Sequence, residues 1–301
     1  MAAEAAPGSV GSFGGALKGD RGADLALRLT LVALLLSPIG GPGLRLLLLA
    51  LPAAGLVFPP LLRRASLWGL LGTLAALRVA LDWPLADNHA YLLAYWCLAV
   101  AFSLGARDVP GALARNARVL VGLVFAFATL WKILSPDYLD GSFLGATLLL
   151  DPRFEGATRW FAGISLEDLE AHRAVLRAHV DGLQPAAVAG LELAHRFSWM
   201  ATGATLWTVA IEALLAVVFL WPGERGPARL RDAALLVFAA STYSVATVEG
   251  FGWLLLAMGL AQCPAERRRT RLAYVAAFAL ILFYREVPWA VWLAEHAPLP
   301  T

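Results

Sequence analysis

The chain has 301 residues, of which 59% are hydrophobic and 15% are charged, whereas ordinary soluble domains carry about 25% charged residues. The mean hydropathy is +0.68. This composition predicts an all-α polytopic membrane protein and leaves little chain for a separate soluble domain. The net charge of +2 is too small to indicate a nucleic-acid partner.

The amino terminus is predicted to be a disordered tail over residues 1–20, because its first seventeen residues are rich in alanine, glycine and serine. Asp20–Ser37 could also be a signal peptide, with Arg21 and Arg28 flanking a short apolar core. An uncleaved first span fits the charge pattern of the loops better.

The two cysteines, Cys97 and Cys263, lie in or at the end of apolar stretches. They are expected to be small packing residues, and no CxxC motif or Cys/His cluster indicates a metal or redox site.

Apolar stretches recur along the chain at lengths suited to a bilayer, whose core of about 30 Å requires roughly 20 helical residues. We expect one domain over residues 21–295. The stretch between Arg231 and Pro264, with Glu249 in its middle, has room only for two short tilted helices or for a hairpin that turns inside the membrane. In total the sequence predicts about nine spans, near residues 23–39, 42–61, 65–82, 88–105, 117–136, 197–221, 231–247, 249–263 and 271–293.

The charges of the connections alternate in sign. The connections without basic clusters carry Asp82 and Asp87, the 136–196 segment with nine acidic against five basic residues, and Glu249. By the positive-inside rule, this pattern predicts an amino terminus inside and a carboxyl terminus outside. The basic clusters on the inner side are Lys18/Arg21, Arg63/Arg64, Arg107/Arg115/Arg118, Arg225/Arg229/Arg231 and Arg267/Arg268/Arg269/Arg271.

One sizeable extramembrane piece, a helical insertion at about 151–196, is expected on the outer face. Ser165 followed by Glu167 and Asp168 indicates a helix start with a serine N-cap. Apolar residues then recur at helical spacing as far as Leu183. This amphipathic helix is expected to lie on the bundle or on the outer interface, where a partner membrane protein could also dock.

A single lysine follows thirteen apolar or small residues, Val119–Trp131. Lys132 inside a span costs roughly 2.5–3.5 kcal/mol at the bilayer centre, so it raises a functional hypothesis. In the predicted topology Asn88, His89 and Glu249 fall at the same outer level, which predicts a polar pocket open to the outer face. The alternative is that Lys132 snorkels outward as an anchor.

Glu212 lies in the apolar segment TVAIEALLAVV, too deep to snorkel. It is expected to face the bundle interior and to be paired or protonated. A packing role and a role in proton movement both remain open. Asp137, Tyr138 and Gly141 are typical of a helix exit with an interfacial tyrosine and a glycine cap.

Two short motifs carry a family resemblance: Asn88-His89-Ala90-Tyr91-Leu92, and Trp131 to Gly141 with the sequence WKILSPDYLDG. They resemble the membrane part of vitamin K-dependent gamma-carboxylase and the bacterial horizontally transferred transmembrane (HTTM) proteins of the same superfamily. Glu212 and Gly250-Phe251-Gly252 match that pattern too, and the resemblance covers roughly residues 20–290.

The resemblance implies a multi-pass protein of the bacterial inner membrane that binds a quinone or a lipid-like molecule. It gives Lys132 the role of base toward a reduced quinone and gives Asn88 and His89 a polar positioning role. We expect His89 to be a second catalytic residue beside Lys132. The residues that we expect to bind or position a ligand are Asn88, Tyr91, Glu212, Glu249, Asp137 and Tyr138.

The sequence departs from the carboxylase pattern in three ways. The second lysine of the pair is Ile133, no histidine occurs in Leu236–Val248, and the large outer β-rich domain that holds peptide substrates is missing. A carboxylase of protein glutamates is therefore not expected. Two other classes stay open: a non-catalytic transporter with Glu212 and Glu249 on a polar pathway, and a structural subunit that docks through residues 151–196.

Overall fold

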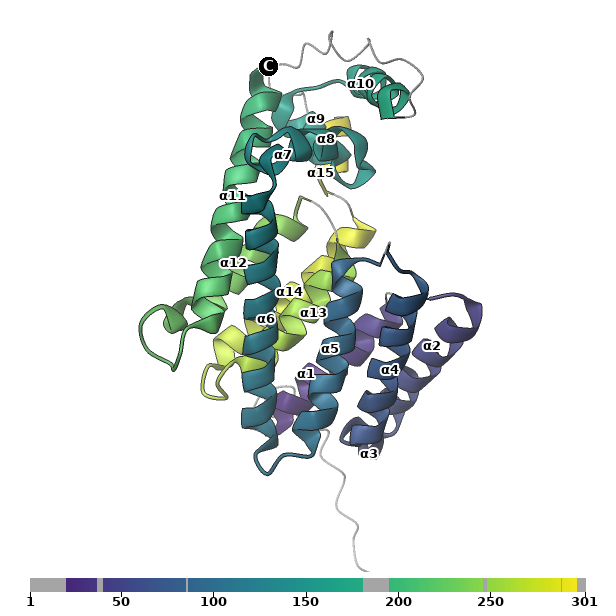
Figure 1. The fold of residues 1–301 in the computed structure, drawn as a ribbon, viewed down its shortest axis with the longest axis vertical. Coiled ribbons are helices and arrows are strands. Elements are labelled where there is room, and N and C mark those ends of the chain that lie inside the picture. The colour runs from purple at the N-terminus through teal and green to yellow at the C-terminus, as the bar shows by residue number, and fades with distance from the viewer. Residues whose placement is uncertain are drawn as a thin grey trace, which may run out of the picture. The chain divides into compact units, whose positions relative to one another are not determined.

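The computed structural model describes residues 20–36, 40–84, 86–180, 195–245, 248–287 and 289–296, and the regular structure in these ranges is helical throughout (Figure 1). The chain forms two compact units. Unit 1 comprises Met1–Leu120 and Trp253–Ala276, and unit 2 comprises Val121–Gly252 and Ala277–Thr301. The expectation of an all-helical protein is confirmed for the described residues.

Two described helices are long and apolar enough to cross a membrane. They are α6 (Val109–Leu134) and α11 (His195–Leu220), each of 26 residues and about 39 Å long at 1.5 Å per residue. A third candidate arises if α14 (Arg268–Glu286) and α15 (Trp289–His296), bent by 44°, count as one span. The shorter apolar helices are α2 (Pro42–Val57), α4 (Ala65–Leu81), α5 (Asn88–Leu104) and most of α13 (Glu249–Gln262).

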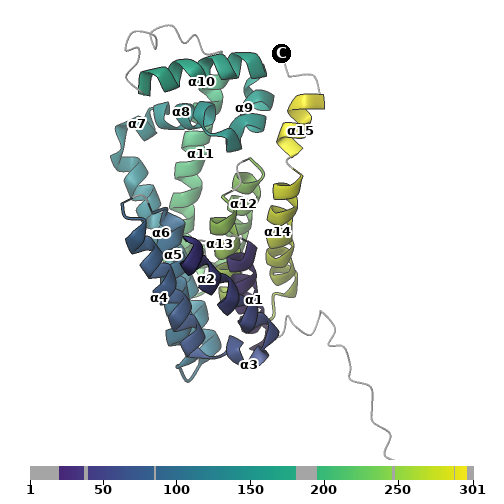
Figure 2. The ribbon, with the colours of Figure 1, turned by 90° about the vertical axis from the view of Figure 1, so that its right-hand side faces the viewer.

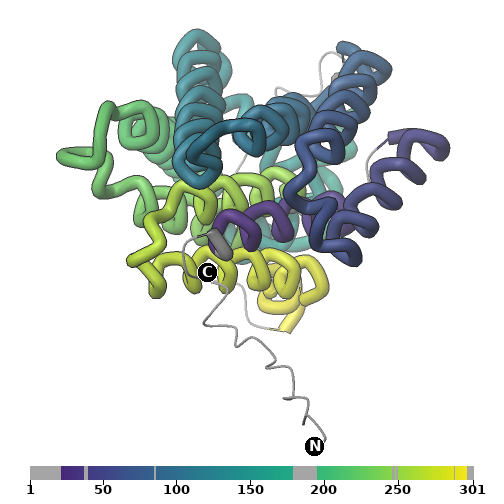
Figure 3. The backbone as a smooth tube through the Cα atoms, turned by 90° about the horizontal axis from the view of Figure 1, so that it is seen from below, coloured from purple at the N-terminus to yellow at the C-terminus, as the bar shows by residue number. Residues whose placement is uncertain are grey.

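Unit 1 begins with α1 (Asp20–Leu36) and continues through α2, α3 (Pro59–Leu62), α4 and α5. Figure 3 shows one helix following another from the purple α1 to the blue α5. The helices α4 and α5 approach closely at Gly72, where a Cβ atom would stand 2.8 Å from Leu98 Cδ2. The fully buried Trp96 of α5 donates its indole N–H to Thr30 Oγ1 of α1 at 3.0 Å.

The part of α13 that belongs to unit 1 is buried on all sides. Every residue from Trp253 to Leu260 is buried, and Trp253, Leu256 and Met258 are fully so. A helix that is apolar all round is typical of the centre of a bundle.

Proline residues divide two of the predicted spans. The span predicted at 42–61 is wrong as a single helix, because α2 ends at Val57 and α3 begins at Pro59. Phe58 between them has extended backbone, with φ −109° and ψ 91°, as expected for a residue that precedes proline. The span predicted at 271–293 is likewise divided, since α14 ends at Glu286, two residues before Pro288.

The helix that contains most of the predicted span 117–136 begins before it. In the structure α6 begins eight residues earlier, at Val109. Asp108 Oδ1 accepts a hydrogen bond from the Gly111 N–H at 3.0 Å, which satisfies one of the free N–H groups of the first turn. The helix ends at Leu134, because Ser135 precedes Pro136 and takes extended φ and ψ angles of −99° and 109°.

The stretch from 231 to 264 contains two short helices, α12 (Arg231–Tyr243) and α13. Residues 246–247 between them lie outside the described residues, and both alternatives, two short spans or a hairpin inside the membrane, stay predictions. At 13 and 14 residues each is about 20 Å long, shorter than a hydrocarbon core of about 30 Å.

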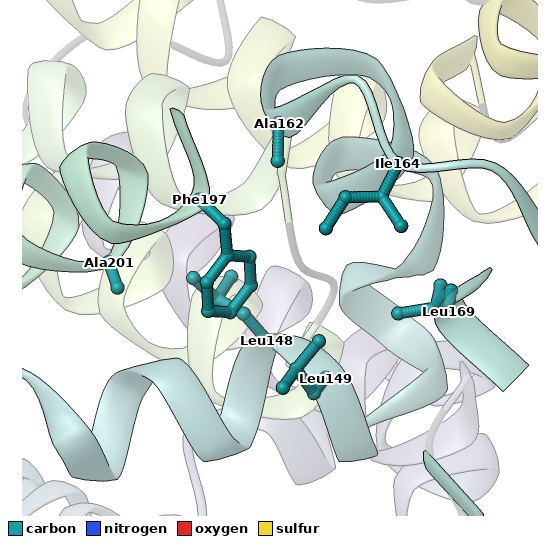
Figure 4. Packing of buried hydrophobic residues seen from close by; sticks show 7 residues of the cluster. All are labelled: Leu148, Leu149, Ala162, Ile164, Leu169, Phe197 and Ala201. Carbon is teal, nitrogen blue, oxygen red and sulfur yellow. The ribbon is translucent and has the colours of Figure 1, made fainter. Parts of the chain in front are cut away.

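Unit 2 contains a cap of short helices beside α11: α8 (Ser142–Leu150), the 3-10 turn η2 (Pro152–Phe154), α9 (Glu155–Ala162) and α10 (Leu166–Val180). In Figure 2 α10 lies alongside α8 and α9. Side chains from α8 to α11 and the loop at Ile164 form one apolar cluster (Figure 4): Leu148, Leu149, Ala162, Ile164, Leu169, Phe197 and Ala201.

The helix start predicted at Ser165 is confirmed. Ser165 Oγ accepts a hydrogen bond from the Asp168 N–H at 3.1 Å, and α10 begins at Leu166. Leu169 is fully buried in the apolar cluster, with Leu176 packed against it. The apolar side of α10 at Leu169 and Leu176 is therefore covered by this chain, while Leu166 is 40% exposed. Residues 181–194 of the predicted insertion lie outside the described residues.

Candidate functional site

The helices α6 and α11 run side by side in unit 2 (Figure 1). Their backbones approach closely at Gly122, where a Cβ atom would stand 2.6 Å from Leu220 Cδ2. Ten residues further along α6, Lys132 meets Glu212, which lies eight residues before Leu220 in α11. The two longest apolar helices are thus antiparallel neighbours that carry opposite charges at the same level.

The two charged side chains form an ion pair. Lys132 Nζ donates to Glu212 Oε2 at 2.7 Å, and the side chains are 17% and 10% exposed. The Tyr138 ring covers the ammonium, with its centroid 5.3 Å from Nζ, a distance suited to a cation–π contact. The expectation that Glu212 faces the interior with a partner is confirmed, and the Lys132 ammonium is directed at Glu212. Each charge balances the other in a place where either alone would be costly.

A tight corner positions Tyr138. After α6 ends, α7 (Pro136–Leu139) forms a single turn, and Gly141 follows in the left-handed region at φ 83°. The Ser142 N–H donates to Asp140 Oδ1 at 2.8 Å and fixes the entry into α8. The expected glycine cap at Gly141 is therefore present, and it serves as the N-cap of α8.

The Tyr138 side chain is buried and held on two sides. Its ring stacks on Phe143 with centroids 5.4 Å apart, and its hydroxyl lies near the Thr208 side chain of α11. Burial, together with the negative charge of Glu212, raises the pKa of Tyr138 to about 12, against the lowering effect of Thr208. The phenol thus stays protonated and can act as a hydrogen-bond donor.

Two further hydroxyl groups on the same helices have no partner. Thr129 precedes Lys132 by about one turn, and Thr205 precedes Glu212 by two turns; both are buried, and neither Oγ1 has a hydrogen-bond partner. Thr205 Oγ1 stands 3.8 Å from the place that a Cβ at Gly141 would occupy. Buried hydroxyls without partners are uncommon, and these two supply free polar groups close to the ion pair.

Aromatic rings line the α6 face one turn below Thr129. Phe125 makes an edge contact with Phe238 at 4.9 Å between centroids and a tilted contact with Phe251 at 6.3 Å. The buried Tyr243 packs edge-on to Phe238 at 6.2 Å and lies within electrostatic range of Glu212. The ion pair of Lys132 and Glu212 thus lies further along α6 than the aromatic rings at Phe125.

The predicted residues of the first motif lie in unit 1, in the first turn of α5. Asn88 is exposed and Tyr91 is partly buried. His89 Nε2 stands 3.8 Å from Asp87 Oδ2, and the two side chains are 29% and 69% exposed. Because Lys132, Glu212 and Tyr138 belong to unit 2, the shared pocket of the two motifs stays a prediction.

Two other predicted residues take no described part in the ion pair. Asp137 is exposed on α7, where its backbone carbonyl accepts a hydrogen bond from Ser142 Oγ at 3.0 Å. Glu249 begins α13, and its side chain lies outside the described residues. The described partner of Lys132 is Glu212.

Sequence reasoning missed Thr129, Thr205, Thr208 and Tyr243. Threonine is common in apolar helices, so its presence alone is no signal. A usable signal was the spacing to the charges, since Thr208 and Thr205 lie four and seven residues before Glu212 and share its face. Among the described residues, no group of three or more His, Cys, Asp or Glu side chains could hold a metal ion.

Comparison with known proteins gave no match: no family model, no curated protein and no solved structure is similar to this chain at a significant level.

Proposed function

We propose that the chain is a multi-pass integral membrane protein of the HTTM type, in the inner membrane of a bacterium, with about nine spans and the amino terminus inside. The support is the composition, the alternation of loop charges, the two motifs and the two 26-residue apolar helices. In this arrangement the short apolar helices cross with help from their flanking residues, and the carboxyl end of α6 faces outward.

The proposed activity is base chemistry by Lys132 on a quinone-like or lipid-like ligand. The single observation that carries it is the Lys132–Glu212 contact of 2.7 Å between two helices of membrane length. In a region of low dielectric, one proton can move along this hydrogen bond and leave a neutral amine beside a neutral carboxyl group. A neutral amine is what a general base requires.

In the proposed step, one proton passes from the ligand to Lys132. The Lys132 amine takes the proton of a ligand hydroxyl group, so that the ligand becomes an oxyanion and the lysine an ammonium, while Glu212 keeps its own proton. The ammonium then stabilises the oxyanion that it has created. The Tyr138 hydroxyl, Thr129 and Thr205 would supply hydrogen bonds to the ligand, and the aromatic rings at Phe125 would contact its apolar part.

A short-chain naphthohydroquinone tests the activity, because its anion has its own absorption band. The purified chain in detergent should bind the probe and form the anion at a pH where the free probe stays neutral. Lys132→Ala should lose the anion, and Lys132→Arg should bind the probe without deprotonating it, because a guanidinium stays charged. Thr147→Ala, whose hydroxyl bonds only the Phe143 carbonyl of its own helix, serves as the control. If both Lys132 variants form the anion as wild type does, the base role is refuted.

A second candidate is a proton-coupled transporter, favoured by a buried carboxylate in the middle of α11. It predicts flux in liposomes that follows a proton gradient, is lost in Glu212→Gln, and is indifferent to added quinone. Flux that persists in Glu212→Gln would remove this candidate.

A further inference from the structure

A second group of polar atoms without partners lies in the cap of unit 2, away from the ion pair. Three side-chain nitrogens of α9 and α10 are buried without a hydrogen-bond partner: Arg159 Nε, His172 Nδ1 and Arg173 Nη2. Two of them belong to guanidinium groups, which are positively charged under all ordinary conditions. Leaving a buried N–H of a charged group unpaired costs more than leaving a neutral one.

Arg173 is held in place by its other two nitrogens. Its Nε donates to the Leu149 carbonyl at 2.7 Å, and its Nη1 donates to Glu155 Oε2 at 2.7 Å. The residue is 9% exposed. The guanidinium is therefore fixed between α8 and α9, with its third nitrogen left without an acceptor.

Arg159 lies on the same side of α9 as Glu155, because four residues separate them. Its Nη2 donates to the Ala294 carbonyl of α15 at 3.3 Å, while its Nε has no partner. Around Glu155 there are thus two arginines and one carboxylate. The nearby Asp151 pairs with Arg153, so neither Asp151 nor Glu155 supplies an acceptor to the free nitrogens of Arg159 and Arg173.

We propose that Arg159 and Arg173 bind a phosphate group, either free or in a lipid headgroup. Guanidinium groups match the oxygens of a phosphate in charge and in geometry. A phosphate has enough acceptor oxygens to serve donors from two helices at once.

The test uses the full chain purified in a phosphate-free sugar detergent, with thermal unfolding as the readout. Inorganic phosphate, sulfate and acetate are compared at equal ionic strength. In a separate arm, phosphatidylglycerol is compared with a glycolipid that carries no phosphate. We expect saturable stabilisation by inorganic phosphate or by phosphatidylglycerol, and the arm that responds identifies the source of the phosphate.

The variants decide whether the response belongs to this site. Arg173→Gln and Arg159→Gln should each weaken phosphate binding by about tenfold or more, since one hydrogen bond to a charged group is worth roughly 1.5–3 kcal/mol. Arg159→Gln leaves the Leu149 and Glu155 contacts of Arg173 in place, so it remains informative if Arg173→Gln fails to fold. Arg177→Gln, at an exposed position of α10, should respond as wild type does.

Two results would overturn the proposal. One is the absence of any stabilisation by either phosphate source. The other is an equal response in wild type, Arg159→Gln and Arg173→Gln, which would mean that the buried nitrogens are hydrated only. Neither result depends on base chemistry at Lys132, so the two proposals fail separately.

Discussion

The helix pair α4 with α5 in unit 1 and the helix pair α6 with α11 in unit 2 both pack closely at a glycine. The two pairs differ in the side chains that lie between the helices. Each has a glycine where the partner backbone comes near: a Cβ at Gly72 would lie 3.1 Å from the Leu98 N atom, and one at Gly122 would lie 3.2 Å from the Leu220 N atom. The first pair is joined by apolar contacts around buried residues such as Trp68 and Leu71. The second pair carries the Lys132–Glu212 ion pair.

Comparison of the two helix pairs shows whether close helix packing in this chain requires a buried charge. The pair of α4 and α5 shows that close helix packing in this chain is reached without a buried charge. A buried ion pair adds little net stability over well-packed apolar residues. Close packing of α6 with α11 therefore does not by itself require the two charges that they carry.

The largest effect should come from removing one member of that pair. Glu212→Leu leaves Lys132 buried without an opposite charge, and the expected loss is about 3–5 kcal/mol of unfolding free energy. Chemical or thermal unfolding of the detergent-purified chain would measure it. The double variant Lys132→Met with Glu212→Leu should recover most of the loss, because both charges are then gone. A double variant as unstable as the single one would mean that the ion pair itself holds α6 to α11.

The same ion pair shows how far sequence reasoning reaches. A lysine and a glutamate in long apolar stretches are visible from composition alone, and the cost of burying each predicts a partner. That the two are each other's partners follows from the pairing of α6 with α11, which lie 80 residues apart at this contact. No local pattern encodes that pairing.

Helix boundaries were predictable where a local residue sets them and uncertain elsewhere. Ser165 was the predicted start of a helix, and α10 begins directly after it. The early start of α6 at Val109 was not expected, because Arg115 and Arg118 suggested a loop. A helix can continue through charged residues outside an apolar core, so hydropathy marks the apolar stretch and not the helix.

The second largest loss of stability is expected when a large side chain replaces the glycine at either close helix contact. Gly72→Leu and Gly122→Leu should each cost roughly 1–3 kcal/mol by overpacking. Gly69→Leu and Gly203→Leu are matched controls on α4 and α11, since a Cβ at either position meets no atom within 4 Å. Unfolding of the four variants under one condition is the measurement. If the controls lose as much stability as Gly72→Leu and Gly122→Leu, close approach is not the cause.

A smaller effect is expected at the corner that joins α6 to α8. Tyr138→Phe removes the buried hydroxyl near Thr208 but keeps the ring over Lys132, so the loss should stay below about 1 kcal/mol. Because the pKa of Tyr138 is raised to about 12, the protonated phenol stabilises the fold below about pH 10, and this contribution falls as pH rises toward 12. Tyrosinate absorbance should show one fewer late-titrating group in Tyr138→Phe. An unchanged titration would contradict the raised pKa.

The smallest effect belongs to the cap, where the ion pair of Asp151 with Arg153 is partly exposed and spans only two residues of chain. The Arg153 hydrogen bond holds the pKa of Asp151 below its usual value of 3.8. A lowered pKa contributes stability that is present above about pH 4 and is lost as pH falls through the value in the folded state. For an exposed pair this contribution should stay below about 1 kcal/mol. Asp151→Asn should therefore lower the unfolding temperature slightly at neutral pH and not at all in strong acid. If the difference in unfolding temperature between wild type and Asp151→Asn grew on acidification, Asp151 would not be stabilised as the carboxylate. The contrast between this surface ion pair and the buried ion pair at Lys132 would then be lost.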